Sequence, residues 1–288
     1  MDSTGKFLKN LVDAHGAPGF EGDVARVMQG YLKDVGPITR DRLGSFVCEK
    51  KGGSGPKVML AGHLDEVGFM VKSVTKEGFV KFLPLGGWWG HVVLAQRLII
   101  KTRKGDVLGV VGSKPPHELR DEDRKKVLEI REMFIDVGAT SDWDARKRLD
   151  IRPGDPIIPD SPFAVMANPN VYLAKAWDNR IGCAMAAETV RQLKGVAHPN
   201  TAFAVATVQE EVGLRGATTV RSVVPRPRRP PGAGSVAAGA AAGCGFFCCE
   251  PGVSAFRVLL IQVPWFTCGL KPPDFSSAWA CLYHCEFG

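Results

Sequence analysis

Hydrophobic positions near the start of the chain follow first a helical and then a strand pattern. Apolar residues three and four positions apart predict helices over Lys6–Ala14 and Asp23–Val35. The short apolar runs Ser45–Lys50 and Lys57–Gly62 predict strands separated by a glycine-rich turn. This order of elements is typical of an α/β domain, and the second strand leads directly to His63.

The pattern changes between residues 68 and 164, where strand signals dominate. Four strands separated by glycine turns are predicted there: Val67–Val74, Phe79–Leu83, Val92–Thr102 and Val107–Val111. One helical pattern follows them, at Asp121–Glu132. We therefore expect a mostly β domain at 68–164, inserted into a discontinuous α/β domain made of residues 1–67 and 165–222.

The α/β pattern returns after the insertion. Val171–Ala176 and Thr201–Val208 are apolar and predict strands. Ile181–Leu193, between them, predicts a helix with small residues on one face. Taken together, the predicted helices and strands indicate an α/β fold with a mixed sheet flanked by helices and with the β domain inserted into it.

Ionisable residues follow three of the predicted strands. They are His63 and Asp65 after the first, Asp178 after the second, and Glu210 and Glu211 after the third. Parallel strands in one sheet bring their carboxyl ends to the same edge, where open α/β sheets place their sites. We therefore expect these five side chains to lie close together.

This set of side chains suits a divalent metal such as zinc, manganese or cobalt. His63 would be a ligand, and Asp65 would accept the other N–H of its imidazole. Asp178 can bridge two ions, and of the two glutamates one can bind metal while the other acts as a base toward a metal-bound water. Two ions about 3.5–4 Å apart would hold both an attacking hydroxide and a peptide carbonyl.

Each of these residues taken alone has a simpler explanation. A histidine at a strand end is often only hydrogen-bonded, Asp178 could cap a helix, and adjacent glutamates commonly end a solvated strand. A glycosidase could use two carboxylates, but they must face each other across about 5–10 Å of substrate. Neighbours on a regular strand point to opposite faces. The joint occurrence at three strand ends favours the metal site.

Three spaced motifs carry a more specific resemblance. They are AGHLDEVG at 61–68, WDNRIG at 177–182 and QEEVGLRGA at 209–217, supported by PPH at 115–117, IDVGA at 135–139 and RPGD at 152–155. In this order they closely resemble the dinuclear aminopeptidases of metallopeptidase family 42. This is the glutamyl and tetrahedral aminopeptidase group, some of whose members carry an endoglucanase label. The resemblance covers residues 1 to about 222.

The resemblance implies a role for each matching position. His63 would bind one metal ion, Asp178 would bridge two, and Glu211 would bind the other. Glu210 would be the general base, passing a proton from the bridging water to the leaving amine, and Asp65 would orient His63. The implied reaction removes the N-terminal residue of a peptide, with zinc expected and cobalt or manganese as alternatives. The inserted domain would be the family's dimerisation domain, and members commonly build hollow dodecamers.

The tail, residues 223–288, departs from that family. The family pattern implies an Asp roughly two dozen residues after the glutamates and a His near the C-terminus, and neither motif is present. No Asp or Glu occurs between Arg221 and Glu250, and residues 222–245 are dominated by Pro, Arg, Gly and Ala. A disordered tail and a shifted reading frame after about codon 222 both explain this composition. Either way, we expect an incomplete site with weak metal binding, low activity and poor folding.

Composition and charge exclude several other classes. Arg226, Arg228 and Arg229 form the main basic cluster in a chain of net charge +7, and nucleic-acid binding is not expected from them. No apolar stretch reaches about 18 residues, so no membrane span is expected. The N-terminus shows no secretory pattern, which makes a cytoplasmic location the expectation.

The sequence thus predicts a metal-dependent aminopeptidase that acts on peptide substrates as a homo-oligomer and is impaired in this chain. Two alternatives stay open: an inactive, metal-poor assembly subunit, and a carbohydrate hydrolase. Metal content and activity distinguish the first, and cellulose cleavage the second.

Overall fold

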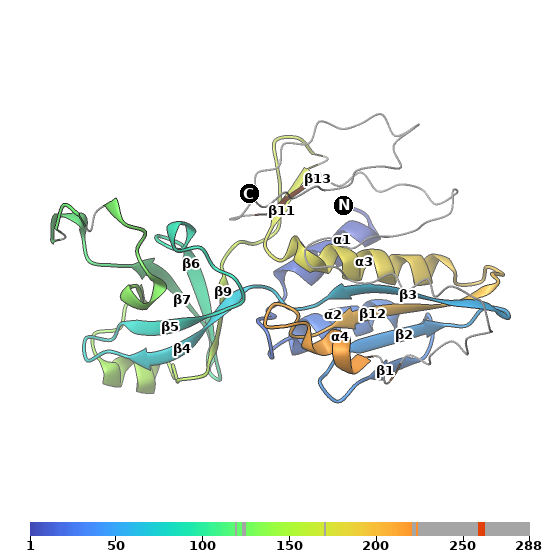
Figure 1. Cartoon of the computed structure of the whole chain (residues 1–288), viewed down its shortest axis with the longest axis horizontal. Helices are drawn as coiled ribbons and strands as arrows, with labels where there is room; N and C mark the ends of the chain where they lie inside the picture. Colours follow the sequence, from blue (N-terminus) through green and yellow to red (C-terminus); the bar gives the residue numbers. More distant parts are fainter. Residues whose placement is uncertain (119, 123–124, 170, 221–222, 224–258, 263–288) are drawn as a thin grey trace.

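The computed structural model describes residues 1–118, 120–122, 125–169, 171–220, 223 and 259–262. A closed β-barrel lies beside a sheet that carries helices (Figure 1). The mixed α/β fold class with an attached β-rich part is confirmed.

The main sheet has four strands in the order β1-β2-β12-β3. Their bounds are Ile38–Arg40 (β1), Phe46–Lys50 (β2), Asn200–Thr207 (β12) and Gly55–His63 (β3). β12 runs parallel to β3 and antiparallel to β2, and Thr207 is in register with His63. The two parallel strands therefore deliver their following residues to the same sheet edge.

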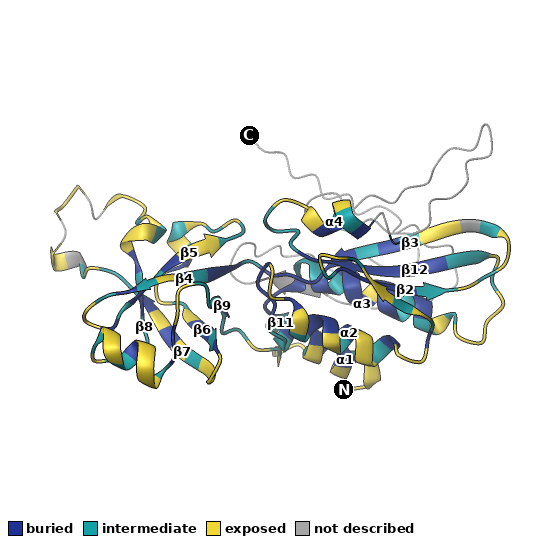
Figure 2. Ribbon diagram, turned by 90° about the horizontal axis from the view of Figure 1, so that it is seen from below, coloured by how far each residue is buried: buried dark blue, intermediate teal, exposed yellow. Residues whose placement is uncertain are grey.

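Three helices cover one face of this sheet: α1 (Ser3–Asp13), α2 (Gly22–Leu32) and α3 (Trp177–Gln192). The Asp2 carboxylate starts α1 by accepting a hydrogen bond from Gly5 N at 2.7 Å. Alternate strand residues such as Phe46, Cys48 and Ala204 face these helices in one buried core. Figure 2 shows that core as the buried layer between the helices and the strands. The short helix α4 (Arg215–Val220) lies on the other side, where Val220 joins a small cluster with Phe203.

One predicted pairing is wrong. The strand at 171–176 was expected in the same sheet as the other two, but β11 (Val171–Ala174) belongs to a separate three-stranded sheet. It pairs antiparallel with β10 (Ala164–Val165) and parallel with β13 (Leu259–Gln262). β13 is the described part of the tail beyond residue 223; the rest of the predicted low-complexity tail lies outside the described residues.

The barrel closes in the order β4-β5-β8-β7-β6-β9. Its strands are Gly68–Val74 (β4), Val80–Leu85 (β5), Arg97–Thr102 (β6), Gly105–Gly112 (β7), Phe134–Asp136 (β8) and Pro156–Pro159 (β9). Alternate residues point inward and form a core of their own, which includes Phe69, Leu98, Ile100 and Ile157. The barrel thus stands on its own hydrophobic cluster, distinct from that of the sheet.

Two further predictions in this part are wrong. Asp121–Glu132 is not an α-helix: its described residues form turns and a short 3₁₀ segment, η4 (Ile130–Glu132). The charged run before Val127 offers no apolar face, whereas Leu128 and Ile130 pack on the barrel core. The long strand predicted at Val92–Thr102 is also shorter, because the 3₁₀ segment η1 (Gly90–Val92) and a turn precede β6.

Two further short segments are η2 (Pro116–Glu118) and the π-helical η5 (Asp144–Arg148). In the described part of the chain, no helix is long and apolar enough to cross a membrane.

The chain passes between the sheet and the barrel twice, at residues 64–67 and 160–163. The first passage is tied to the sheet region by a hydrogen bond from Glu66 N to Gly16 O at 2.9 Å. The second is tied by one from Phe163 N to the Asp13 carboxylate at 2.7 Å.

Candidate metal centre

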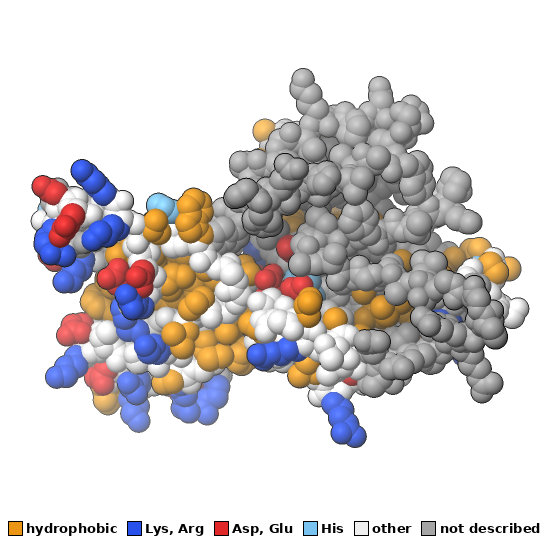
Figure 3. All heavy atoms as spheres, viewed as in Figure 1, with side chains coloured by type: hydrophobic (Ala, Val, Ile, Leu, Met, Phe, Trp, Pro, Cys, Tyr) orange, Lys and Arg blue, Asp and Glu red, His pale blue; other side chains and the backbone are white. Residues whose placement is uncertain are grey.

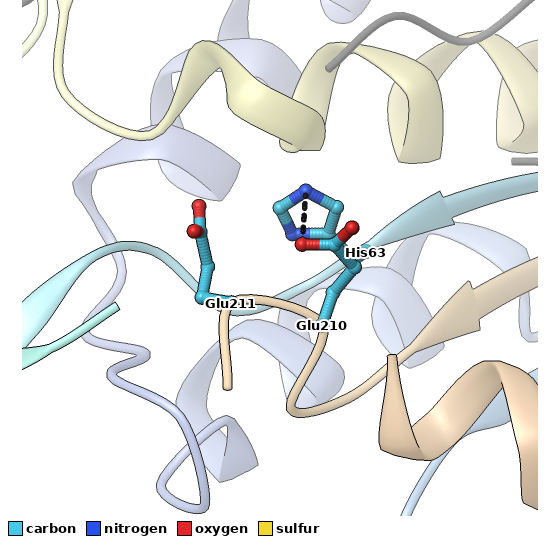
Figure 4. Close-up of side chains that lie close together, drawn as sticks. All are labelled: His63, Glu210 and Glu211. Carbon is cyan, nitrogen blue, oxygen red and sulfur yellow. Dashed lines mark ion pairs between the residues drawn. The ribbon is translucent and has the colours of Figure 1, made fainter. Parts of the chain in front are cut away.

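The candidate site lies where β3 and β12 end side by side. His63 is the last residue of β3, and its partner in register, Thr207, ends β12. After Thr207 the chain turns sharply, with Gln209 in the left-handed region at φ 54°. This turn leaves the regular strand, so that Glu210 and Glu211 both reach toward His63 (Figure 4).

Three donor groups come together at this edge. One ligand atom from each of His63, Glu210 and Glu211 lies within 4.8 Å of the others. His63 Nε2 is 3.7 Å from Glu210 Oε2, the ion pair drawn in Figure 4. His63 is buried, and the two glutamates are partly buried. Neighbouring glutamates were expected to diverge on a regular strand, and the turn at Gln209 explains why they do not.

Asp178 reaches the same imidazole from a different element. Its Oδ1 is 3.1 Å from His63 Nε2, although Asp178 is not one of the three mutually close donors. It stands at the start of α3, where its backbone is not helical, rather than at the end of a third strand of the main sheet. Asp178 therefore meets His63 by a route that the sequence did not predict.

Glycine 62 allows this approach between β3 and α3. A Cβ at Gly62 would lie 2.5 Å from Cys183 N, a distance that real structures essentially never show. Only a residue without a side chain lets the strand end rest against the first turn of α3. The neighbouring His63 is thereby placed beside Asp178.

Asp65 organises both sides of the site. Its backbone carbonyl accepts a hydrogen bond from His63 Nδ1 at 3.0 Å, whereas its carboxylate Oδ1 is farther from that nitrogen, at 3.6 Å. The fully buried carboxylate instead accepts the backbone N–H groups of Glu210 and Glu211, each at 3.0 Å. That this carboxylate orients the imidazole stays a prediction, and its two bonds to the glutamate turn are a contact that the sequence did not predict.

The site carries an excess of buried negative charge. Burial raises the pKa of Glu211 to about 7; the nearby imidazole of His63 opposes this rise, and neighbouring carboxylates reinforce it. Burial also raises the pKa of Glu210. Burial alone lowers the pKa of His63, but the carboxylates of Asp178 and Asp65 outweigh it and raise that pKa to about 10.

The donor set fits a divalent metal ion. Imidazole nitrogen and carboxylate oxygen are the ligands of zinc and related ions. Burial makes the charged forms of Glu210 and Glu211 costly, and a bound cation supplies the opposite charge that stabilises them. His63 Nδ1 must donate, because a backbone carbonyl can only accept, and this leaves Nε2 as the nitrogen that faces the carboxylates.

Two buried charged residues beside the site were not predicted to matter. Glu66 and Arg180 form an ion pair at 2.9 Å, with side chains 2 % and 0 % exposed. Arg180 stands in the WDNRIG motif at the start of an otherwise small and apolar helical pattern. An arginine among small and apolar helix residues was the signal in the sequence that could have revealed this buried ion pair.

Comparison with known proteins places these motifs in one family. The family model described as M42 glutamyl aminopeptidase matches residues 44–226. The putative aminopeptidase FrvX of Escherichia coli strain K12 is 44 % identical over 217 residues, covering 74 % of this chain and 59 % of that protein. The chain thus spans less than two thirds of that relative's length.

Solved structures agree with the sequence comparison. The TET aminopeptidase of a marine-sediment archaeon of the Thaumarchaeota superposes with a TM-score of 0.75 at 46 % identity, over 77 % of this chain and 64 % of that one. The TET1 peptidase of Pyrococcus horikoshii, which can assemble into a tetrahedron or an octahedral shell, gives a TM-score of 0.66 at 28 % identity, over 75 % and 64 % of the two chains.

The match ends close to the point where the sequence changes character, which confirms that the tail departs from the family pattern. Residues 44–226 make up more than half of the chain and contain all five predicted site residues: His63, Asp65, Asp178, Glu210 and Glu211. The chain belongs to the M42 glutamyl aminopeptidase family.

Proposed function

We propose that this chain carries the site of a metal-dependent aminopeptidase, which removes the N-terminal residue from peptides. The observation that supports this most is the meeting of His63, Glu210 and Glu211 at the ends of two parallel strands, within reach of Asp178. A glycosidase explains this arrangement less well, because its two carboxylates must stand apart across the substrate.

The proposed roles follow from position and charge. His63 and Glu211 would be terminal ligands, and Asp178 would bridge two divalent ions, with zinc, cobalt and manganese as candidates. When bound, such ions polarise a peptide carbonyl and make water a stronger nucleophile near neutral pH. Glu210 would take the proton from that water and deliver it to the leaving amine, while Asp65 holds the turn that carries both glutamates.

We further propose that the reaction is impaired in this chain. Its resemblance to the family implies two more ligands, in a part of the sequence where residues 223–288 show no matching motif. Each metal ion would keep one terminal ligand and the shared Asp178. Losing even an indirect partner of a metal site typically costs about 10–100-fold in affinity or activity, and losing a ligand costs more.

The first experiment measures chelator-sensitive hydrolysis of glutamyl, leucyl and lysyl p-nitroanilides by the purified chain with added Zn²⁺ or Co²⁺. Glu210→Gln is expected to lower the residual kcat about 10²–10⁴-fold, because general-base catalysis contributes that much, and to leave bound metal nearly unchanged. Glu129→Gln is the matched control, because Glu129 is exposed on the barrel side of the chain and pairs with Arg131.

Each alternative predicts a different result. Metal-free, inactive protein would indicate an assembly subunit, and cleavage of cellulose without cleavage of anilides would indicate a carbohydrate hydrolase. Two tightly bound ions with robust turnover would overturn the proposed impairment. Sequencing the coding DNA across codons 215–290 tests the shifted-frame explanation, which requires an alternative frame that encodes an Asp near position 234 and a later His motif.

We also propose a homo-oligomer built through the barrel. Leu83 on β5 and Leu108 and Val110 on β7 are exposed on the barrel wall. Figure 3 shows apolar side chains gathered on one face of the barrel with charged groups around them. Exposed apolar patches of this kind often mark protein interfaces. Light scattering of the wild type and of Leu108→Lys tests this, since a monomeric wild type would contradict it. No nucleic-acid or membrane partner is proposed, and a cytoplasmic location stays a prediction.

A further inference from the structure

Arg180 is a fully buried arginine two residues beyond Asp178. Its side chain is 0 % exposed, and it extends from the start of α3 toward the end of α1 and the strand end that carries His63. Burying a guanidinium is costly unless every N–H finds an acceptor. The hydrogen bonds of this side chain show which parts of the chain it connects.

The guanidinium reaches acceptors on two segments, the end of α1 and residues 64–66. Nη1 donates to Leu11 O at 2.9 Å, Val12 O at 3.2 Å and Ala14 O at 2.6 Å; Nη2 donates to Glu66 Oε1 at 2.9 Å; Nε donates to Leu64 O at 2.9 Å. The first three acceptors are at and just beyond the carbonyl end of α1, which favours a cation. The second of these segments directly follows His63 and contains Asp65.

The bond to Leu64 is the one that bears on the site. Leu64 stands between His63, which ends β3, and Asp65, whose carboxylate holds the glutamate turn. Arg180 belongs to the same turn of chain as Asp178. One rigid, planar side chain therefore connects the two backbone segments whose side chains meet as His63 Nε2 and Asp178 Oδ1 at 3.1 Å.

Glu66 completes this connection from the other end of the same segment. Its Oε1 accepts from Arg180, and its backbone N–H donates to Gly16 O at 2.9 Å. The segment from His63 to Glu66 is thereby held at Leu64 O and at Glu66 by a single guanidinium. Arg is suited to this task because its donors form a fixed fork, whereas the ammonium of Lys is a point charge on a flexible stem.

Lys175 shares the cluster without sharing this connection. Its Nζ donates to Glu66 Oε1 at 2.6 Å and to Ala14 O at 3.0 Å, and the side chain is 6 % exposed. It thus pairs with the same carboxylate and the same carbonyl as Arg180. Its side chain makes no hydrogen bond to Leu64, which makes it a control matched in burial, charge and partners.

We propose that Arg180, held by Glu66, is a positioning residue that fixes His63 against Asp178 and so sets the metal affinity of the site. The proposal rests on the proposed metal site. The guanidinium of Arg180 makes no hydrogen bond to His63, Asp178 or Glu211, and it acts through the backbone of Leu64.

The test compares Arg180→Lys with Lys175→Met in two measurements. Zn²⁺ affinity, determined by competition with a chromophoric chelator, is expected to fall about 10–100-fold in R180K, as is usual when an indirect partner of a metal site is lost, and to stay unchanged in K175M. The visible absorption of bound Co²⁺ is expected to change with it, because the geometry of coordination changes. Circular dichroism establishes that each variant is folded at the temperature used.

The second measurement needs no metal. The ring nitrogens of His63 are observed by ¹⁵N NMR in the metal-free protein, assigned with a His63→Gln variant. Their resonances are expected to move in R180K, because His63 shifts relative to Asp178, and to stay in place in K175M. If R180K does not fold, Glu66→Gln takes its place, with a smaller movement of the same resonances expected.

The outcomes separate the two proposals. Unchanged His63 resonances in R180K, or an equal change in K175M, would overturn the positioning role, since the cluster would then serve stability alone. If the wild type binds no Zn²⁺ while R180K still moves the His63 resonances, the metal function fails and the positioning of His63 stands.

Discussion

The barrel and the sheet region treat charge in opposite ways. The barrel core consists of apolar side chains, and its buried carboxylate Asp150 lies at the rim, where Arg103 and Arg152 pair with it. The sheet region buries both positive and negative groups next to its core: His63, Asp65, Glu66, Lys175 and Arg180. The barrel interior is apolar, as is usual in folded domains, whereas the sheet region buries several charged groups at one place.

This difference indicates that the buried charges of the sheet region are kept for a reason other than folding stability. The attraction between two buried charges often does not exceed the free energy lost when they leave water. Apolar residues of similar volume therefore often give the same or a higher folding stability. Apolar residues could fill the space of Lys175, Arg180 and Glu66, yet the chain keeps two cations and an anion there. Their presence indicates a constraint other than folding stability. In this chain the cluster surrounds the segment that carries His63 and Asp65.

Removing Arg180 is expected to have the largest effect on folding. Arg180→Ala leaves Glu66 with one cation and takes the side-chain donors from Leu64 O and from the end of α1. Breaking a buried pair in this way costs about 3–5 kcal/mol of unfolding free energy, as urea denaturation would measure. A loss below about 1 kcal/mol, the range of exposed ion pairs, would contradict the contrast between the regions.

A cavity in the barrel core is expected to cost nearly as much but to leave the site alone. Leu98 is fully buried in that core, and Leu→Ala changes of this kind cost about 2–5 kcal/mol. Urea denaturation measures the loss in Leu98→Ala, and the NMR resonances of His63 in the folded variant report on the site. Altered His63 resonances would show that the two regions are less independent than their separate cores indicate.

Lys175 is expected to give the sheet region a pH-dependent stability. Burial lowers the pKa of Lys175 to about 8 in the folded chain, although Glu66 opposes this, and the unfolded value is near 10.5. Between pH 8 and 10.5 the unfolded chain therefore binds more protons, and stability rises with pH by up to about 1.4 kcal/mol per unit. Below pH 8 this contribution is flat.

Denaturation curves of the wild type and Lys175→Met across this range provide the measurement. The groups that face Lys175, namely Glu66, Arg180, Asp13 and His15, are the same in both proteins, so the difference isolates Lys175. Parallel pH profiles would show that the ammonium is better solvated than its burial indicates.

An exposed pair on the barrel is expected to show the smallest effect. Arg148 donates to Asp144 across one turn of η5, and the arginine side chain is 55 % exposed. Solvent screens such pairs, so Arg148→Ala is expected to leave the urea midpoint within experimental error. A clear loss would mean that surface ion pairs stabilise the barrel as buried ones do the sheet region.

Much of the fold followed from hydrophobic period alone. The helices at 6–14 and 23–35 and the strands around His63 and before Gln209 are present within a few residues, because each has one regular apolar face. The predicted helix at 121–132 is absent because Leu128 and Ile130 pack on the barrel core instead of forming a helical face, and Val127 is exposed. The spacing of apolar residues in a short segment cannot show which distant part of the chain they pack against.

The candidate residues were also visible in the sequence, but their geometry was not. His63, Glu210 and Glu211 meet as predicted by the parallel pairing of β3 and β12. Asp178 arrives from the start of α3, which depends on the close contact at Gly62, and no pattern in the sequence encodes a contact of that kind. The hydrogen bonds from the glutamate turn to Asp65 were not predicted either, because they join residues 145 and 146 positions apart along the chain.

The first passage of the chain from sheet to barrel has a mechanical consequence. Residues 63–67 both border the candidate site and join β3 to β4, and they are clamped at Leu64 and Glu66. A force on the barrel therefore has two covalent routes into the sheet region, and one of them runs through the backbone beside His63.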